Sequence, residues 1–362
     1  MKRYFLHGSL LLLLIATGSG LWAQIPNGYY NNANGKTGDE LKTALHEIIT
    51  NHQTVSYAGL LNAFAYTDCD ANGKIWDIYS NYHYELTDNG EEFTQEGQGW
   101  NREHTWPQSW FNEQTTPRSD LFHVYPTDGY VNNVRGNYAF GEVSSASYTH
   151  DGCKFGSNKS ISIAHTMLGD NEVSTSCGNN QRVFEPADQY KGDFARGYLG
   201  ALLRWSGDYQ AFTQEDGRKI FSGQYTVSGH FGLTEYGIAL LLKWHRQDPV
   251  SRKEIDRNNG IQSQQGNRNP FIDYPYLAEF IWGEKAGETV YLNQLMASTD
   301  PDFVPGQSNG WRGGEPIIDP EQGMEETGVQ QSVVKVQKML INGQLFIQVG
   351  EYIYDVTGKK IN

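Results

Sequence analysis

Apolar residues recur at helical spacing in several segments of the chain. In residues 39–52, Leu41, Leu45, Ile48 and Ile49 fall on one face of a helix, and Asp39 precedes them as a candidate N-cap. The same spacing predicts core-packing helices at residues 57–66, 192–205 and 233–245, and a more polar helix at 250–261.

Other segments alternate between apolar and polar residues, as strands do. Strands are expected at residues 74–80, 100–106 and 121–125. The last of these leads to Pro126, a residue that suits the first position of a helix, and that helix would carry Asn132. The pattern as a whole predicts an α+β domain with more helix than strand.

The first 23 residues have the pattern of a signal peptide. Lys2 and Arg3 form a basic start, residues 10–16 an apolar run, and residues 21–23 a small-residue exit. The apolar run is shorter than the roughly 20 residues that a permanent membrane helix needs, and no other stretch approaches that length. We therefore expect a mature protein that begins near Gln24 and works outside the cytoplasm.

The C-terminal part differs in composition from the rest. From about Pro301 the chain becomes rich in Pro, Gly and acidic residues, so residues 291–331 are expected to form an exposed linker after a catalytic domain at 24–290. Residues 332–362 alternate as short strands around turns at Asn342-Gly343 and Thr357-Gly358, which predicts a small β-rich tail.

Composition limits the function. The hydrophobic content of 38% in 362 residues is enough for one large core. The net charge of −14 argues against a passive nucleic-acid binder, whereas an enzyme needs only a local basic groove and a bound cation. Three cysteines allow at most one internal disulfide, for which Cys153 and Cys177 are the expected pair, with Cys69 free or buried.

A carboxylate stands beside an imidazole in the segment Asn101-Arg102-Glu103-His104-Thr105-Trp106-Pro107-Gln108-Ser109-Trp110. Neighbours on a strand point to opposite faces, so one side chain could hold a metal while the other faces a substrate. Pro107 favours an early end to the strand. Taken alone, a histidine in such a Trp-rich stretch is more often a core residue.

A second segment changes that balance. Residues 117–138 contain the expected strand, Pro126 and the helix with Asn132, which gives a ββα order after His104. In these residues the chain resembles the bacterial endonuclease I and extracellular nuclease family. The shared segments are Arg-Glu-His-Thr-Trp-Pro, Tyr-Pro-Thr-Asp-Gly, Val-Asn and Arg-Gly-Asn, and further matches at residues 184–196 and 265–273 extend the resemblance over about 28–283.

The resemblance implies a His-Me finger (ββα-metal) site. His104 would be the general base, Glu103 and Asn132 the ligands of a divalent ion, and Arg135 or Arg118 a contact to phosphate. The chain has Asn133 where the family often has Gly, so Asn132 and Asn133 could compete as ligand. Mg²⁺ is the expected ion, with Mn²⁺ or Ca²⁺ as alternatives.

The chemistry agrees with these roles. A neutral imidazole can take a proton from water, and an ion with oxygen ligands and open positions stabilises the leaving oxygen. Activity is then expected to fall with a midpoint near the usual imidazole pKa of roughly 6.5.

Other polar residues have two interpretations. Arg268, beside Asn267 in an expected loop, could fork onto a substrate phosphate or anchor the loop. His123 could support the site from behind, although strand histidines are more often structural. Asp128, near the expected helix start, has a sufficient structural role there.

The sequence therefore predicts a secreted, sequence-nonspecific endonuclease acting on DNA and RNA as a monomer. The tail, with Gly343-Gln344-Leu345-Phe346-Ile347, resembles the sorting tail of type IX secretion substrates, which implies a secretion machinery as partner. Two alternatives remain: a secreted binding or adhesion module with a degenerate nuclease fold, and a phosphodiesterase for small substrates.

Overall fold

The computed structural model describes residues 25–113, 117–178, 181–205, 215–222 and 232–316, with the backbone of three C-terminal strands and residue 361. The expected signal peptide lies outside these residues. The chain divides into two compact units, Met1–Ile317 and Ile318–Asn362. No helix in the described part of the chain is long and apolar enough to cross a membrane.

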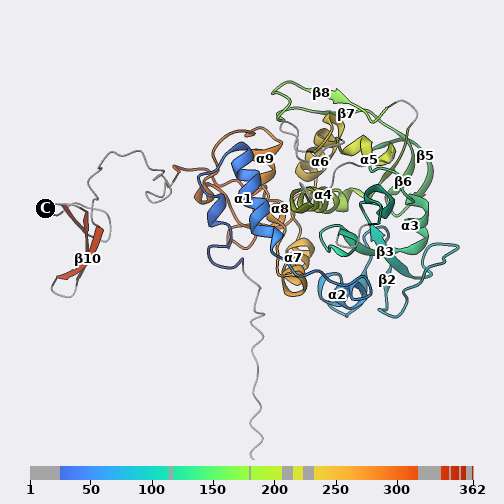
Figure 1. The fold of residues 1–362 in the computed structure, drawn as a ribbon, viewed down its shortest axis with the longest axis horizontal. Helices are drawn as coiled ribbons and strands as arrows, with labels where there is room; N and C mark the ends of the chain where they lie inside the picture. Colours follow the sequence, from blue (N-terminus) through green and yellow to red (C-terminus); the bar gives the residue numbers. More distant parts are fainter. Residues whose placement is uncertain are drawn as a thin grey trace, which may run out of the picture. The chain divides into compact units, whose positions relative to one another are not determined.

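The core of the first unit is helical. Helix α4 is buried over its whole length and packs against α6, whose apolar face includes Leu240 and Trp244. Figure 1 shows this pair in the middle of the unit, with α1, α8 and α9 on one side and α3 on the other. The helices are α1 Gly38–Thr50, α2 Leu60–Thr67, α3 Gly129–Arg135, α4 Lys191–Trp205, α5 Glu215–Ile220, α6 Glu235–Gln247, α7 Arg252–Gln265, α8 Pro270–Asp273 and α9 Leu277–Ile281.

The strands form small antiparallel sheets. Strand β3 (Trp100–His104) pairs with β4 (Val124–Asp128), with Glu103 opposite Tyr125 and His104 opposite Val124. The other strands of the first unit are β1 Ile75–Trp76, β2 His83–Tyr84, β5 Val143–His150, β6 Cys153–Asn158, β7 Ile161–Ile163, β8 Val173–Thr175 and β9 Arg182–Glu185. They pair as β1-β2, β5-β6-β9 and β7-β8. In the second unit, β10 (Val336–Ile341), β11 (Gln344–Val349) and β12 (Tyr352–Asp355) form an antiparallel meander.

Helix α4 packs against the β3-β4 pair at the ends of the two strands. Gly197 allows this contact, because a Cβ at that position would lie 2.8 Å from the backbone oxygen of Phe122, just before β4. The Tyr198 hydroxyl, one residue later, donates to the carbonyl of Thr105, just after β3. The strands that carry the sequence motif therefore rest on the most buried helix of the domain.

The α+β prediction is confirmed, and each helix expected from periodicity has its counterpart in α1, α2, α4, α6 or α7. The second strand of the motif begins later than expected, at Val124, and therefore includes Pro126. A strand paired on one side only tolerates proline. Asp128 begins α3 instead, since its carboxylate accepts hydrogen bonds from the backbone N–H groups of Tyr130 and Val131, both at 2.9 Å.

The catalytic domain does not end at residue 290, and the expected linker at 291–331 is wrong for its first part. Leu295 and Phe303 are buried, and the Trp311 ring stacks on Tyr276 with 4.8 Å between centroids. These aromatic and apolar anchors hold the segment against the domain without a regular element, so periodicity could not reveal it. Residues 317–331 lie outside the described part.

The expected disulfide is also wrong. All three cysteines are free thiols. Cys153 begins β6 and its Sγ donates to the backbone oxygen of Tyr79 at 3.2 Å, whereas Cys177 follows β8 in another sheet. The spacing of Cys153 and Cys177 in the sequence could not predict that they lie at different sheets.

Candidate active site

Asn132 of α3 lies against strand β3. Its Nδ2 donates to Oδ1 of Asn101 at 2.7 Å and, more weakly, to the backbone oxygen of Arg102 at 3.4 Å. The amide oxygen Oδ1 has no hydrogen-bond partner within the described residues. Asn133 is exposed and points elsewhere, since successive helical residues are rotated by about 100°. Of the two candidates, the fold brings Asn132 beside the motif strand.

Glu103 is buried on the same side of β3, with an exposed fraction of 1%. Its Oε1 accepts from the Tyr79 hydroxyl at 2.8 Å and lies 3.0 Å from Nη1 of Arg135. Burial raises the pKa of Glu103, while the Arg135 charge and the Tyr79 hydrogen bond act in the opposite direction. Because both neighbours hold Oε1, the second carboxylate oxygen remains for another ligand.

His104 is held in a single orientation. Its Nε2 donates to the backbone oxygen of Arg118 at 2.9 Å. A carbonyl only accepts, so Nε2 carries the proton and the lone pair is on Nδ1. Burial, together with the nearby His123, lowers the pKa of His104 to about 3. The ring is therefore neutral at physiological pH, the state that a general base requires.

His123 lies beside His104 and binds the same short turn. Its Nε2 donates to the backbone oxygen of Pro117 at 2.7 Å, and the two histidine rings are 6.3 Å apart. Both histidines thus bind consecutive carbonyls of one short 3-10 turn, Pro117–Ser119. His123 is fully buried, in keeping with the structural interpretation of this residue.

The two candidate phosphate-binding arginines differ in their surroundings. Arg135 has an exposed fraction of 1%, and it donates to the backbone oxygens of His104 at 2.9 Å and Thr105 at 2.6 Å as well as pairing with Glu103. It therefore anchors the end of β3 from inside. Arg118 is only partly buried, and its guanidinium donates to the side chain of Gln108.

The residues fit a hard cation better than a soft one. No group of three or more His, Cys, Asp or Glu side chains suited to a metal exists in the described part of the chain. Mg²⁺, however, is commonly held by one or two protein oxygens with water and substrate phosphate. The unengaged oxygens of Glu103 and Asn132 are donors of that kind.

Comparison with known proteins identifies the family. A family model described as Endonuclease I matches residues 37–276. The chain belongs to the endonuclease I family. It is therefore an endonuclease, a hydrolase that acts on the phosphodiester bonds of nucleic acid.

Curated relatives agree with this assignment. The chain is 33% identical to an extracellular ribonuclease of Bacillus subtilis, and 34% identical to one of Bacillus amyloliquefaciens, over 70% of this chain and 78% of each relative. It is 28% identical to a periplasmic deoxyribonuclease of Aeromonas hydrophila over 42% of this chain and 47% of the relative. The alternative of a binding module is not favoured.

Two expected substrate-binding residues of this endonuclease lie in the interior. Arg268 is fully buried, and its Nε and Nη2 donate to the carboxylate of Asp273, both at 2.7 Å. Asn267 is also fully buried and donates to the backbone oxygen of Ile49 at 2.9 Å. Both side chains tie the loop between α7 and α8 to the core, so the interpretation of Arg268 as a loop anchor is the one that the geometry supports.

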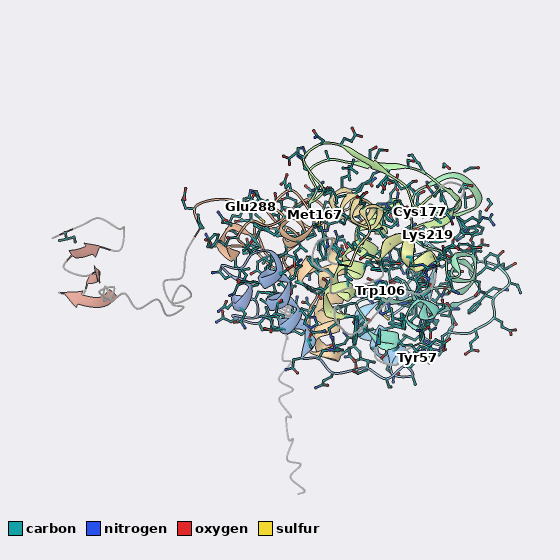
Figure 2. All side chains as sticks on the ribbon, turned by 45° about the horizontal axis from the view of Figure 1, so that its top comes forward. Tyr57, Trp106, Met167, Cys177, Lys219 and Glu288 are labelled. Atoms are coloured by element: carbon teal, nitrogen blue, oxygen red, sulfur yellow. The ribbon has the colours of Figure 1, made fainter. Side chains whose placement is uncertain are left out.

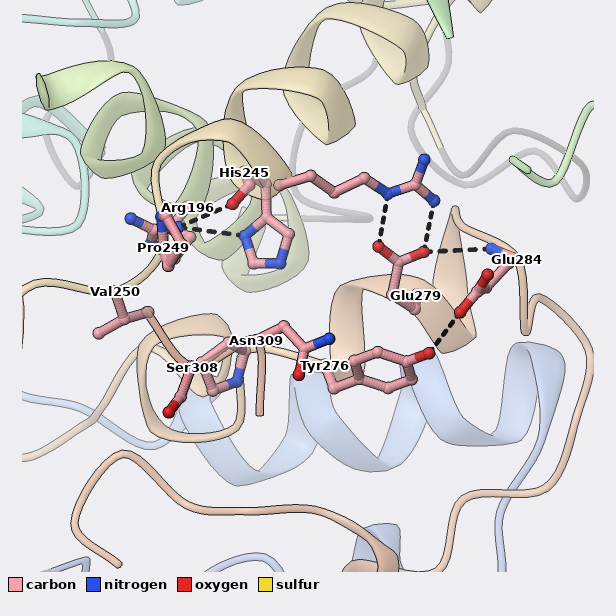
Figure 3. A pocket seen from close by; sticks show the side chains of 11 residues that line it. Arg196, His245, Pro249, Val250, Tyr276, Glu279, Glu284, Ser308 and Asn309 are labelled. Carbon is pink, nitrogen blue, oxygen red and sulfur yellow. Dashed lines mark hydrogen bonds and ion pairs between the residues drawn. The ribbon is translucent and has the colours of Figure 1, made fainter. Parts of the chain in front are cut away.

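A cavity of about 220 Å³ lies elsewhere in this endonuclease, and none of its lining residues belongs to β3, β4 or α3. Figure 3 shows its charged side chains bound to other residues that line the cavity. Arg246 binds both oxygens of Glu279, at 2.7 and 2.6 Å, and the Tyr276 hydroxyl donates to Glu284. The pairing leaves little charge for a polyanion.

Sequence reasoning missed three residues around the site. Tyr79 holds Glu103, and Tyr57 lies beside His104 with 5.9 Å between the ring centroids. Both come from earlier parts of the chain, and no local pattern marks them. The sequence could have predicted Arg102, because residues two apart on a strand share a face and Arg102 precedes His104 by two.

Proposed function

We propose that this endonuclease is an exported, Mg²⁺-dependent enzyme that hydrolyses DNA and RNA without sequence preference. In this proposal His104 is the general base, and Glu103 with Asn132 holds the ion. The observation that carries it is the hydrogen bond from Nε2 of His104 to the Arg118 carbonyl. That bond leaves Nδ1 of a neutral ring free to accept a proton.

The reaction begins with a water molecule beside Nδ1 of His104. The imidazole takes one proton as the water oxygen attacks phosphorus, and the bond to the 3′-oxygen breaks, after which that oxygen takes a proton from solvent. A divalent ion at the oxygens of Glu103 and Asn132, when bound, would supply positive charge for the phosphate and the leaving oxygen. Arg135 holds the end of β3 in place during the reaction, because it donates hydrogen bonds to the carbonyls of His104 and Thr105.

The substrate range rests on the relatives. The matched proteins are named ribonuclease in two Bacillus species and deoxyribonuclease in Aeromonas hydrophila, which supports a chain able to cut both polymers. Their names also place them outside the cytoplasm, which supports export of this chain. We further propose that the C-terminal unit with its three-stranded meander serves type IX export, and that the enzyme is a monomer.

The decisive test is cleavage of supercoiled plasmid and of a labelled RNA by the purified protein. Wild type with Mg²⁺ should cut both, EDTA should abolish cutting, and His104→Ala should lower the rate by about 10²-fold or more. Asn132→Ala should cause a comparable loss, whereas its neighbour Asn133→Ala serves as matched control and should remain near wild type.

Each outcome has a clear meaning. Cleavage in EDTA at the wild-type rate would remove the ion from the proposal. An Asn133→Ala variant as impaired as Asn132→Ala would show that the assignment of the ligand is wrong. Full activity in His104→Ala would refute the base, and intact polymers under all ions would refute the proposed activity itself.

A further inference from the structure

Two arginines and a tyrosine form a stack beside His104. The Cζ atoms of Arg102 and Arg118 each lie 4.0 Å from the centroid of the Tyr57 ring. Both guanidinium groups therefore pack on this one aromatic ring. Figure 2 places Tyr57 toward the margin of the domain, whereas Trp106 lies inside it. We call Tyr57, Arg102 and Arg118 the Tyr57 stack.

The two arginines of the stack have no carboxylate partner among the described residues. Arg102 donates to the backbone oxygen of Tyr57 at 3.1 Å and Arg118 to the side chain of Gln108. Four buried arginines, by contrast, each bind a carboxylate: Arg135 binds Glu103, Arg196 binds Glu254, Arg257 binds Asp68 and Arg268 binds Asp273.

This difference points to an anion. The chain has 42 acidic and 28 basic residues, so carboxylates for two more ion pairs are plentiful. The charges of Arg102 and Arg118 both act on His104, so two positive charges without a carboxylate partner among the described residues lie near the base, and they favour an anion there. Guanidinium binds phosphate through two parallel hydrogen bonds, and both side chains are partly exposed, so a ligand can reach them.

We propose that the Tyr57 stack binds a backbone phosphate of the substrate strand next to the bond that His104 attacks. The inference rests on the proposed function and adds two residues to it, Tyr57 and Arg102. The tyrosine ring holds both guanidinium groups in place before substrate arrives, which reduces the ordering that binding requires. Arg118 links the subsite to the base, because its carbonyl accepts the hydrogen bond that orients His104.

The salt dependence of binding measures such a contact directly. Each phosphate contact contributes about 0.9 to the slope of log K against log salt for duplex DNA, and about 0.7 for single strands. Binding to a labelled 20-mer duplex should be measured at several salt concentrations in the His104→Ala background, which prevents cleavage. Arg102→Gln should reduce the slope by about 0.9.

Kinetics in the otherwise wild-type enzyme give a second readout. Loss of a charge-assisted contact should raise KM by about tenfold or more and leave kcat within a few-fold. Arg252→Gln is the matched control, because Arg252 is exposed and pairs with Asp256 on the surface of α7. Tyr57→Ala should raise KM, while Tyr57→Phe keeps the ring and should keep KM.

Arg102 also donates a hydrogen bond to the backbone oxygen of Tyr57, so the thermal stability of each variant must be measured as a control for folding. If Arg102→Gln fails to fold, Arg118→Gln decides, since it keeps the carbonyl that His104 needs and should lower the slope equally. An unchanged slope and KM in the folded variant overturns the inference, provided that wild type cuts nucleic acid. Absence of cleavage by wild type would instead overturn the proposed function.

Discussion

Replacement of Arg135 by methionine separates an internal anchor from a phosphate contact. The side chains of Arg135 and Glu103 are 1% and 2% exposed, and their charged atoms are 3.0 Å apart. Methionine fills similar volume without a charge, so Arg135→Met leaves the Glu103 carboxylate buried with only the Tyr79 hydroxyl as partner. Breaking a buried pair in this way costs about 3 to 5 kcal/mol.

That loss translates into a measurable change in Tm. A domain of this size loses about 1.6 °C per kcal/mol, so the Tm of Arg135→Met should fall by about 5 to 8 °C. The change should also depend on pH. Burial already raises the pKa of Glu103, and removal of the Arg135 charge raises it further. A carboxyl with a raised pKa in the folded state is tolerated when protonated, so the variant should be less destabilised at acidic than at alkaline pH.

The assay is thermal unfolding by circular dichroism at about pH 5.5 and pH 8, and the loss of Tm should be smaller at the lower pH because the pKa of Glu103 is raised. Arg118→Met is the control, because it removes an arginine that pairs with no carboxylate among the described residues and should change stability by less than about 1 kcal/mol. The double variant Glu103→Gln with Arg135→Met should recover part of the loss. A Tm within about 1 °C of wild type, together with a reduced salt slope, would show that Arg135 contacts phosphate and that the reasoning is wrong.

Three further predictions follow from the same structure. Because burial lowers the pKa of His104 to about 3, its ring stays neutral in mild acid, and kcat/KM should persist to about pH 5 while circular dichroism shows the fold intact. A midpoint near pH 6.5, the usual imidazole value, would contradict this. Asp128→Ala removes the cap of α3 and should lower the free energy of unfolding in urea by about 2 kcal/mol, whereas Asp128→Asn keeps a capping oxygen and should lose less. Thiol titration in denaturant without reductant should find all three cysteines free, and recovery of a single thiol would reveal a disulfide.

The sequence predicted the elements whose signal is local. Helices such as α4 and α6 follow from apolar periodicity, and the order of Glu103, His104 and Asn132 predicted the β3-β4-α3 arrangement. Strand and helix ends were less certain, because Pro126 is compatible with both a helix start and a strand paired on one side. Only the capping hydrogen bonds of Asp128 distinguish the two.

Burial was the property that the sequence could not supply. Arg118, Arg135 and Arg268 all stand in segments that resemble the family, and each was a candidate for phosphate. In the structure Arg135 and Arg268 are buried and each pairs with a buried carboxylate, whereas Arg118 is partly exposed and pairs with no carboxylate among the described residues. The partners of Arg135 lie about 30 residues away on β3, and Asp273 stands in the same segment as Arg268, but neither spacing predicts that the side chains are buried together.

The short turn Pro117–Ser119 connects the two parts of the proposed chemistry. Its first two carbonyls receive the Nε2 protons of His123 and His104, so the turn and the base tautomer are fixed together. The side chain of Arg118 leaves the same turn to join the Tyr57 stack. An anion bound there would therefore be held by the residue that orients the base, and a chain with a net charge of −14 would need only this local pair of arginines to place a phosphate. A phosphate subsite built from these two arginines also favours release of the cut strand, because few contacts must break.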